Sequence, residues 1–244
     1  MILRRVIEHF RKQEWTAIFL DFIIVVLGVF LGVQVNGLVA DAADRRREQA
    51  YLVSLRNDFA VISAELQSDA GAFASIADKM KFLLDQSRMA APSASNEELN
   101  AAAAALIEME GTPMVSGTYE AITGSGELEI IRSKKVKEAL TAFFGRADIV
   151  RLVENTHELQ LVDLFQPYII ANLDYPAMVN KERGMEPPGA FAPDRIDAVL
   201  KTDAFRNVVA VKWDIATDLR NQIVITRAEA DKVTAALDEE LARR

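Results

Sequence analysis

The residue types that most often carry catalysis are scarce in this chain of 244 residues. It has no cysteine, which removes disulfides, thiolate nucleophiles and cysteine-ligated metals together. Its two histidines are His9 and His157, and no second histidine lies four residues from His157, as a zinc-protease helix requires. A lone histidine on a helix is more typical of a surface position or of a satisfied histidine inside a bundle. We therefore expect no catalytic, cofactor or metal site, and a protein that is not an enzyme.

Two further motifs have simple structural interpretations. The sequence Gly124-Ser125-Gly126 could cradle an anion at a helix N-terminus. It lacks the additional glycine and the preceding strand of a dinucleotide loop, and its spacing does not fit a nucleophile elbow. We interpret it as a glycine turn between two helices. The lysines at positions 134, 135 and 137 are interpreted as a solvated helix face.

Charge is distributed unevenly along the chain. The net charge is −8, and the first sixteen residues hold four basic and two acidic side chains, or +2, which leaves −10 for the remainder. An acidic body of this kind argues against nucleic acid as a partner.

The longest apolar stretch runs from Ala17 to Leu38 and has no polar side chain between Phe22 and Val33. Its length matches the roughly 20 residues that a helix needs to cross the hydrocarbon core. We predict a transmembrane helix over residues 17–40, after a short basic tail over residues 1–16. Two alternatives stay open. One is a signal peptide cleaved after the small-x-small sequence Ala40-Asp41-Ala42, and the other is a buried core helix.

Orientation follows from the flanking charges. Four basic side chains precede the apolar stretch, and Arg45, Arg46 and Arg47 follow it. A large following domain can be translocated regardless of its charge, whereas a short basic tail resists translocation. We expect a single-pass protein of the bacterial inner membrane with a cytoplasmic N-terminus and a periplasmic body, and membrane lipid as one partner.

Within the apolar stretch, four residues predict a packing face. Asp21, Gly28, Gly32 and Asn36 fall on one side of a helix, and the two glycines have the small-xxx-small spacing of associating membrane helices. A carboxyl group at this depth is costly unless it faces a partner or water. One interpretation is a contact with a second copy or with another membrane protein. The other is that Asp21 reaches interfacial water and the glycines are incidental.

The rest of the chain, residues 41–244, carries the periodicity of long helices and no convincing strand. A heptad-like seam begins at Leu52 and ends at Leu83, and Ser95 with Glu98 forms a capping box before an alanine-rich helix expected to reach Glu110. Further helices are expected over residues 118–123, from 133 to 172 with a kink or new start at Pro167, and from 202 onwards. This predicts an all-α protein in which the transmembrane helix continues into an antiparallel helical bundle.

Two stretches carry a family resemblance. FIIVVLGVFLGVQVN followed by DRRREQAYLVSLRNDF, and TYEAITGSGELEIIRSKKVKEAL over residues 118–140, resemble a widespread family of uncharacterised bacterial single-pass membrane proteins with a helical extracytoplasmic domain. Such proteins often carry Trp where this chain has Gly37. The resemblance implies a helical, membrane-anchored protein and supplies no activity.

These observations favour an interaction, scaffold or accessory subunit of a membrane complex. The alternative is a ligand-sensing bundle that acts through a partner, with residues 175–193 closing over a pocket between helices.

Overall fold

The computed structural model describes residues 15–175, 178 and 195–243, and those residues form helices and turns without any strand. The predicted all-α class is therefore confirmed. The elements are α2 (Trp15–Arg88), α3 (Asn96–Ala103), η1 (Ala104–Leu106), α4 (Gly117–Gly124), η2 (Glu127–Ile130), α5 (Lys134–Gln160), the π-helical turn η3 (Leu161–Phe165), α6 (Gln166–Asn172), α8 (Ile196–Val199) and α9 (Asp203–Ala242).

The chain divides into two compact units, Met1–Tyr51 and Leu52–Arg244. In the first unit, α2 carries a stretch near the N-terminus that is long and apolar enough to cross a membrane. Its large apolar side chains over residues 19–39 are exposed, apart from the half-buried Ile23. Farther along this unit, Arg45 and Arg47 form ion pairs with Asp41 and Asp44, at 3.0 Å and 2.6 Å.

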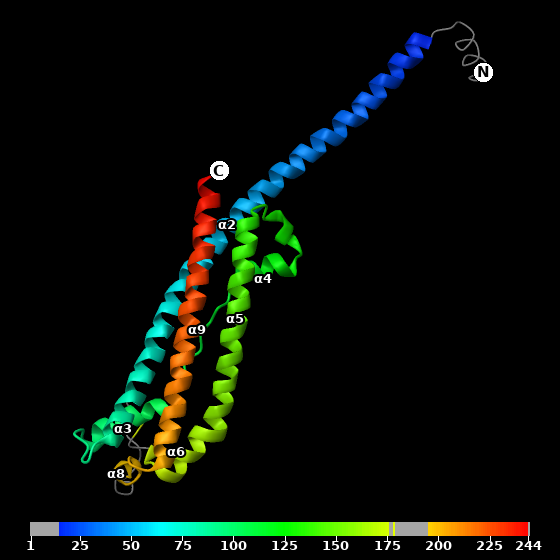
Figure 1. Cartoon of the computed structure of the whole chain (residues 1–244). Helices are drawn as coiled ribbons and strands as arrows, with labels where there is room; N and C mark the ends of the chain where they lie inside the picture. The colour runs from blue at the N-terminus through cyan, green and yellow to red at the C-terminus, as the bar shows by residue number, and fades with distance from the viewer. Residues whose placement is uncertain (1–14, 176–177, 179–194, 244) are drawn as a thin grey trace, which may run out of the picture. The chain divides into compact units, whose positions relative to one another are not determined.

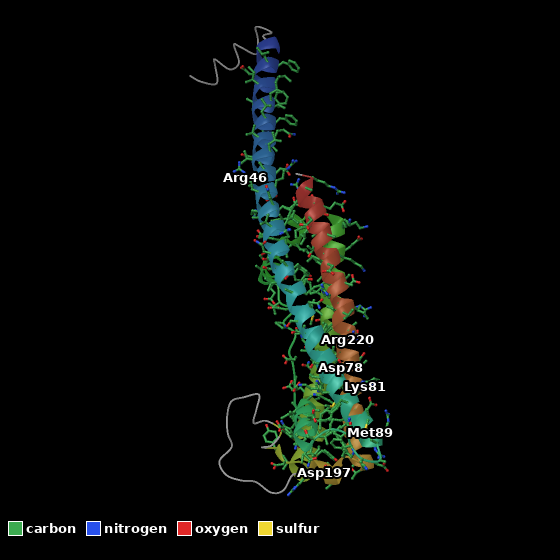
Figure 2. The ribbon with its side chains drawn as sticks, turned by 90° about the vertical axis from the view of Figure 1, so that its left-hand side faces the viewer. Arg46, Asp78, Lys81, Met89, Asp197 and Arg220 are labelled. Atoms are coloured by element: carbon green, nitrogen blue, oxygen red, sulfur yellow. The ribbon has the colours of Figure 1, made fainter. Side chains whose placement is uncertain are left out.

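The second unit is built on three long helices, which are α2 from Leu52 onwards, α5 and α9 (Figure 1). Helices α2 and α9 are antiparallel, because residues farther along α2 form hydrogen bonds with residues earlier in α9. Arg56 bonds Asp238 at 2.7 Å and Ser63 bonds Asp231 at 2.9 Å, so seven residues forward on α2 are seven residues back on α9. Lys81 and Arg220 are among the polar side chains on the outer faces of these helices (Figure 2).

Helix α5 runs antiparallel to α9 and therefore parallel to α2. Lys135, at the start of α5, pairs with Glu239 near the end of α9, and His157 contacts Lys212 nearer the start of α9. Two parallel helices need a connection that returns along the bundle. Residues 107–116, here called the crossing segment, lie in this return path and form neither helix nor strand.

The core follows the seam predicted for α2. All nine seam residues are buried, and they are Leu52, Leu55, Phe59, Ile62, Leu66, Phe73, Ile76, Met80 and Leu83. Phe59 packs edge-on against Phe143 of α5 with 4.8 Å between ring centroids, and Tyr119 of α4 stacks on Phe144 at 4.0 Å. Burial of large side chains such as these supplies most of the favourable free energy of folding.

Helix starts are fixed by side-chain caps. The predicted capping box at α3 is confirmed, because Ser95 accepts from the Glu98 amide while the Glu98 carboxylate accepts from the Ser95 amide. Ser116, Ser133 and Thr202 cap α4, α5 and α9 in the same way, each accepting from an amide three residues on.

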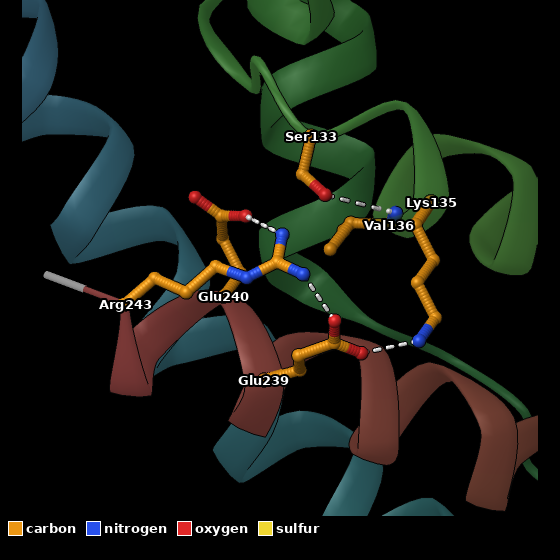
Figure 3. Close-up of polar contacts among 6 residues, drawn as sticks. All are labelled: Ser133, Lys135, Val136, Glu239, Glu240 and Arg243. Atoms are coloured by element: carbon orange, nitrogen blue, oxygen red, sulfur yellow. Dashed lines mark hydrogen bonds and ion pairs between the residues drawn. The ribbon is translucent and has the colours of Figure 1, made fainter.

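An ion-pair network closes one end of the bundle (Figure 3). Glu239 of α9 lies between Lys135 of α5 and Arg243, and Arg243 also lies 3.8 Å from Glu240. The hydrogen bond from Lys135, followed by the positive charges of Lys135 and Arg243, lowers the pKa of the Glu239 carboxyl. Lys135 thus joins two helices while its side chain stays exposed, in agreement with the predicted solvated face.

One predicted boundary differs from the structure, and one expected break is found. The alanine-rich helix ends at Leu106 rather than near Glu110, and beyond it the Glu108 carbonyl accepts from Lys212 instead of from a helical amide. The helix expected from Ser133 to Asn172 has the new start predicted at Pro167, since η3 interrupts it and α6 begins at Gln166. Pro167 cannot donate to the carbonyl of Asp163 and its ring would clash there, which accounts for a widened turn over residues 161–165 before α6 begins.

Candidate functional site

The predicted membrane-face residues all lie on α2, in the first unit. Asp21, Gly28, Gly32 and Asn36 are exposed, and their spacing on a continuous helix places them on one face. A Cβ added at Gly28 or Gly32 would meet no atom within 4 Å. The helix brings the four residues into one row, and their role in association stays a prediction.

A second candidate site lies inside the bundle, where α9 meets α5. The side chains of Lys212 and His157 are 0% and 1% exposed, respectively. Both residues lie in long helices with continuous hydrogen bonding, so their backbones are fixed in place. A fully buried lysine is rare unless its ammonium group is paired, which makes its surroundings informative.

Three acceptors surround the Lys212 ammonium. Its Nζ donates to the backbone oxygen of Glu108 at 2.7 Å and lies 2.8 Å from Nε2 of His157. The third partner is the ring of Phe165, whose centroid lies 5.3 Å from Nζ. An ammonium group has three N–H donors, so this arrangement can satisfy all of them when His157 is neutral and protonated on Nδ1.

Burial shifts both groups toward their neutral forms. Loss of solvent lowers the pKa of Lys212 to about 7, and the negative charge of Glu108 opposes part of this shift. Burial, followed by the positive charge of Lys212, lowers the pKa of His157 to about 4. At neutral pH the buried pair therefore binds fewer protons than the same two side chains would bind in water.

The turn η3 presents Phe165 to this site. A π turn adds a residue to one helical turn and changes which side chains face inward, and such turns are frequent at functional sites. Phe165 is buried, and its ring meets that of His157 edge-on with 6.3 Å between centroids. The lysine, the imidazole and the aromatic ring thus converge from α9, α5 and η3.

A polar cluster of carboxyl groups lies farther along the crossing segment. The Glu154 carboxylate accepts from the backbone N–H of Thr112 at 3.0 Å. Burial raises the pKa of Glu154, and the nearby Asp69 adds to the shift. Burial also raises the pKa of Asp69, with smaller contributions from Glu110 and Glu65. The Oδ2 atom of Asp69 is buried without a hydrogen-bond partner among the described residues.

Sequence reasoning placed His157 on a surface or in a satisfied bundle position, and the second interpretation is correct. It missed Lys212 because the apolar residues Val211 and Ile215, one position before Lys212 and Ala216, suggest a different inward-facing row of α9, whereas Lys212 and Ala216 are the buried residues. Extending the buried spacing back from Leu219 in steps of three and four reaches Ala216, Lys212 and Val209. The sequence signal for this site was a lysine at a position that continues the spacing of the buried residues of α9.

Comparisons with family models, with curated proteins and with solved structures yield no match. Within the described part of the chain, no group of three or more His, Asp or Glu side chains is placed to hold a metal ion. Of residues 175–193, on which the ligand-sensing alternative depends, only Tyr175 and Met178 lie within the described part of the chain. That alternative stays a hypothesis.

Proposed function

We propose that this chain is a single-pass inner-membrane protein whose helical bundle acts by association, as a scaffold or accessory subunit, and not by catalysis. The observation that carries the proposal is the run of exposed apolar side chains over residues 19–39 of α2. Leaving so many large apolar groups in water is unfavourable by roughly 1.5–3 kcal/mol for each side chain, and lipid removes that cost. The resemblance of residues 22–59 to single-pass membrane proteins supports the same proposal.

The bundle interior supports the non-enzymatic part of the proposal. Lys212 and His157 have the chemistry of a general base or nucleophile, but both are enclosed by α5, α9 and the crossing segment. A catalytic group must come within about 3 Å of a reacting atom. A substrate could not contact either side chain unless the bundle opened.

Association through the membrane helix is the most specific part of the proposal. The row formed by Asp21, Gly28, Gly32 and Asn36 offers small residues for close approach and two polar groups for interhelical hydrogen bonds. A second copy or another membrane protein would cover this row. A cytoplasmic N-terminus with the bundle in the periplasm follows from the basic tail.

The test replaces both glycines of the row in the full-length chain with isoleucine (Gly28→Ile with Gly32→Ile). Gly37→Ile is the matched control, because Gly37 lies nine residues after Gly28 and so about 180° around the helix. None of these added side chains would meet an atom of the chain near its Cβ. Cross-linking in native membranes, followed by sizing in mild detergent, should show loss of the cross-linked species in the double variant and retention in the control.

Equal cross-linking of the double variant and the wild type would remove the glycine row from the proposal. Membrane anchoring is tested separately by alkaline carbonate washing, which leaves integral proteins in the pellet. Release of the full-length chain into the supernatant would overturn the anchor itself. Reporter fusions at the C-terminus, one active only outside and one only inside the cytoplasm, test the orientation.

A further inference from the structure

The crossing segment is held in the bundle by side chains rather than by secondary structure. Its residues alternate, with Thr112, Met114 and Ser116 buried and the residues between them exposed. A segment in this conformation cannot pair its own backbone groups, so other groups must satisfy them. Polar side chains of α9 and α5 satisfy backbone groups of the segment, and polar side chains of α2 bond its side chains.

Helix α9 holds the start of the segment through Lys212, whose Nζ donates to the Glu108 carbonyl at 2.7 Å. Helix α2 holds the same residue from another side, since Lys79 pairs with the Glu108 carboxylate at 2.7 Å. Glu108 is therefore bound by two lysines on two helices, with Lys212 at its backbone carbonyl and Lys79 at its carboxylate.

Helices α5 and α2 hold the rest of the segment. Glu154 of α5 accepts from the Thr112 amide at 3.0 Å. Asp58 of α2 accepts from the Ser116 hydroxyl at 2.7 Å and from the Thr118 amide at 3.1 Å, which fixes the segment where α4 begins. Every one of these contacts comes from the side chain of a lysine or of an acidic residue.

We propose that the crossing segment opens and closes on the bundle in response to pH, with the buried Lys212–His157 pair as the sensing group. In the closed state Lys212 is enclosed by the Glu108 carbonyl, His157 and Phe165. Removing the segment takes away the Glu108 carbonyl and lets water reach the ammonium group. Protonation of the pair therefore favours the open state, and its neutral form favours the closed state.

The charged groups around the pair set the direction of the response. Lys212 faces His157 on α5 and Glu108 on the segment, and Glu108 is in turn paired with Lys79 on α2. Glu154 lies on α5, with Asp69, Glu65 and Glu110 nearby. Its contribution to the pH dependence of opening has the opposite sign, because exposing a buried carboxyl favours its ionised form. Above pH 7 the lysine is the group still to titrate, since its pKa is about 7 in the closed state and returns toward 10.5 when hydrated.

The experiment is hydrogen exchange with mass spectrometry on the full-length chain in lipid nanodiscs at pH 7, 8 and 9, corrected for intrinsic exchange rates. We expect the protection factors of the segment amides, above all that of the Thr112 amide bonded to Glu154, to rise with pH by up to tenfold per unit. Lys212→Met should make these protection factors independent of pH to within about twofold. Lys232→Met, an exposed lysine of the same helix, is the matched control and should behave as the wild type.

Two results of the exchange experiment would overturn the proposal. One is a flat profile in the wild-type chain. The other is a segment that exchanges only together with the core amides of α5 and α9, which would mean that it never opens alone. If Lys212→Met fails to fold, NMR titration of the Lys212 side chain in the wild type replaces it. A lysine that titrates near pH 7 without a matching change in segment protection would equally refute the proposal.

Discussion

Lys212 Nζ and His157 Nε2 lie 2.8 Å apart in the interior of the bundle, and the two side chains come from helices that run in opposite directions. Their separation allows one shared hydrogen bond and excludes two positive charges at that distance, where repulsion is little screened. When Lys212 is protonated it donates, and the histidine then presents the lone pair of Nε2. The pair therefore ties the protonation state of the core to the packing of α5 on α9.

The first prediction concerns the pH dependence of stability. Below pH 7, Lys212 is protonated in both the folded and the unfolded chain, and the cost of burying its charge is constant. Between pH 7 and 10.5 the folded chain loses the proton while the unfolded chain keeps it. The free energy of unfolding should therefore rise with pH in this window, by at most about 1.4 kcal/mol per unit.

Denaturant unfolding of the full-length chain in detergent, followed by circular dichroism between pH 7 and 9.5, measures this rise. Lys212→Met removes the titrating group and should flatten the profile, whatever its effect at any single pH. A Lys212→Met profile as steep as that of the wild type would assign the rise to other groups.

The second prediction concerns Glu154, which accepts from the buried amide of Thr112. Glu154→Ala leaves that amide unpaired, whereas Glu154→Gln keeps an acceptor and removes the charge. We expect the alanine variant to be less stable than the glutamine variant by about 1–3 kcal/mol at pH 7. Burial raises the pKa of Glu154, so wild-type stability falls as this carboxyl ionises with rising pH, and the glutamine variant should lack that fall.

Thermal unfolding of both variants at pH 5 and pH 7 separates the two effects. The hydrogen bond appears as a difference between the variants at both pH values. The ionisation appears as a fall in stability from pH 5 to pH 7 in the wild type relative to the glutamine variant, because His157 and Asp69 titrate in all of these chains. Equal stability of the alanine and glutamine variants would mean that water replaces the carboxylate at Thr112.

The spacing of apolar residues was sufficient to predict the buried face of α2, because every core position of its seam is an apolar residue. The cap at Ser95 could also be predicted, since Ser95 and Glu98 satisfy each other's amides within four residues. Both signals are local. The start of α5 at Ser133 was equally readable from its capping hydroxyl.

The bundle site could not be predicted in the same way. A lysine is normally assigned to the surface, and Lys212 is buried because Glu108 and His157, distant in sequence, supply acceptors. The path of the crossing segment likewise depends on tertiary contacts, such as Asp58 with Ser116, that leave no periodic pattern. The turn η3 could be suspected from Pro167, but not its π geometry.

The third prediction compares two large side chains of α5. Phe143 is fully buried and packs against Phe59, whereas Leu152 is 66% exposed. Phe143→Ala should lower the free energy of unfolding by about 3–5 kcal/mol, because it removes buried surface and leaves a cavity. Leu152→Ala should change it by no more than about 0.5 kcal/mol. Denaturant midpoints measured at one pH decide the matter, and a comparable loss from both variants would mean that Leu152 is covered in the folded protein.

The fourth prediction concerns Gly126, which follows α4 and has a left-handed backbone with φ of +74°. An added Cβ would meet no atom within 4 Å, so any cost of Gly126→Ala must come from the backbone itself. Left-handed backbone costs an L-residue with a side chain roughly 1–2 kcal/mol, and we expect a loss of that size. Gly124→Ala is the matched control two residues away, since Gly124 is the last residue of α4 and has helical backbone, where alanine is favoured over glycine by up to about 1 kcal/mol. Thermal unfolding should therefore move the two variants in opposite directions, and a Gly126→Ala variant as stable as the wild type would mean that this turn relaxes to a conformation with negative φ.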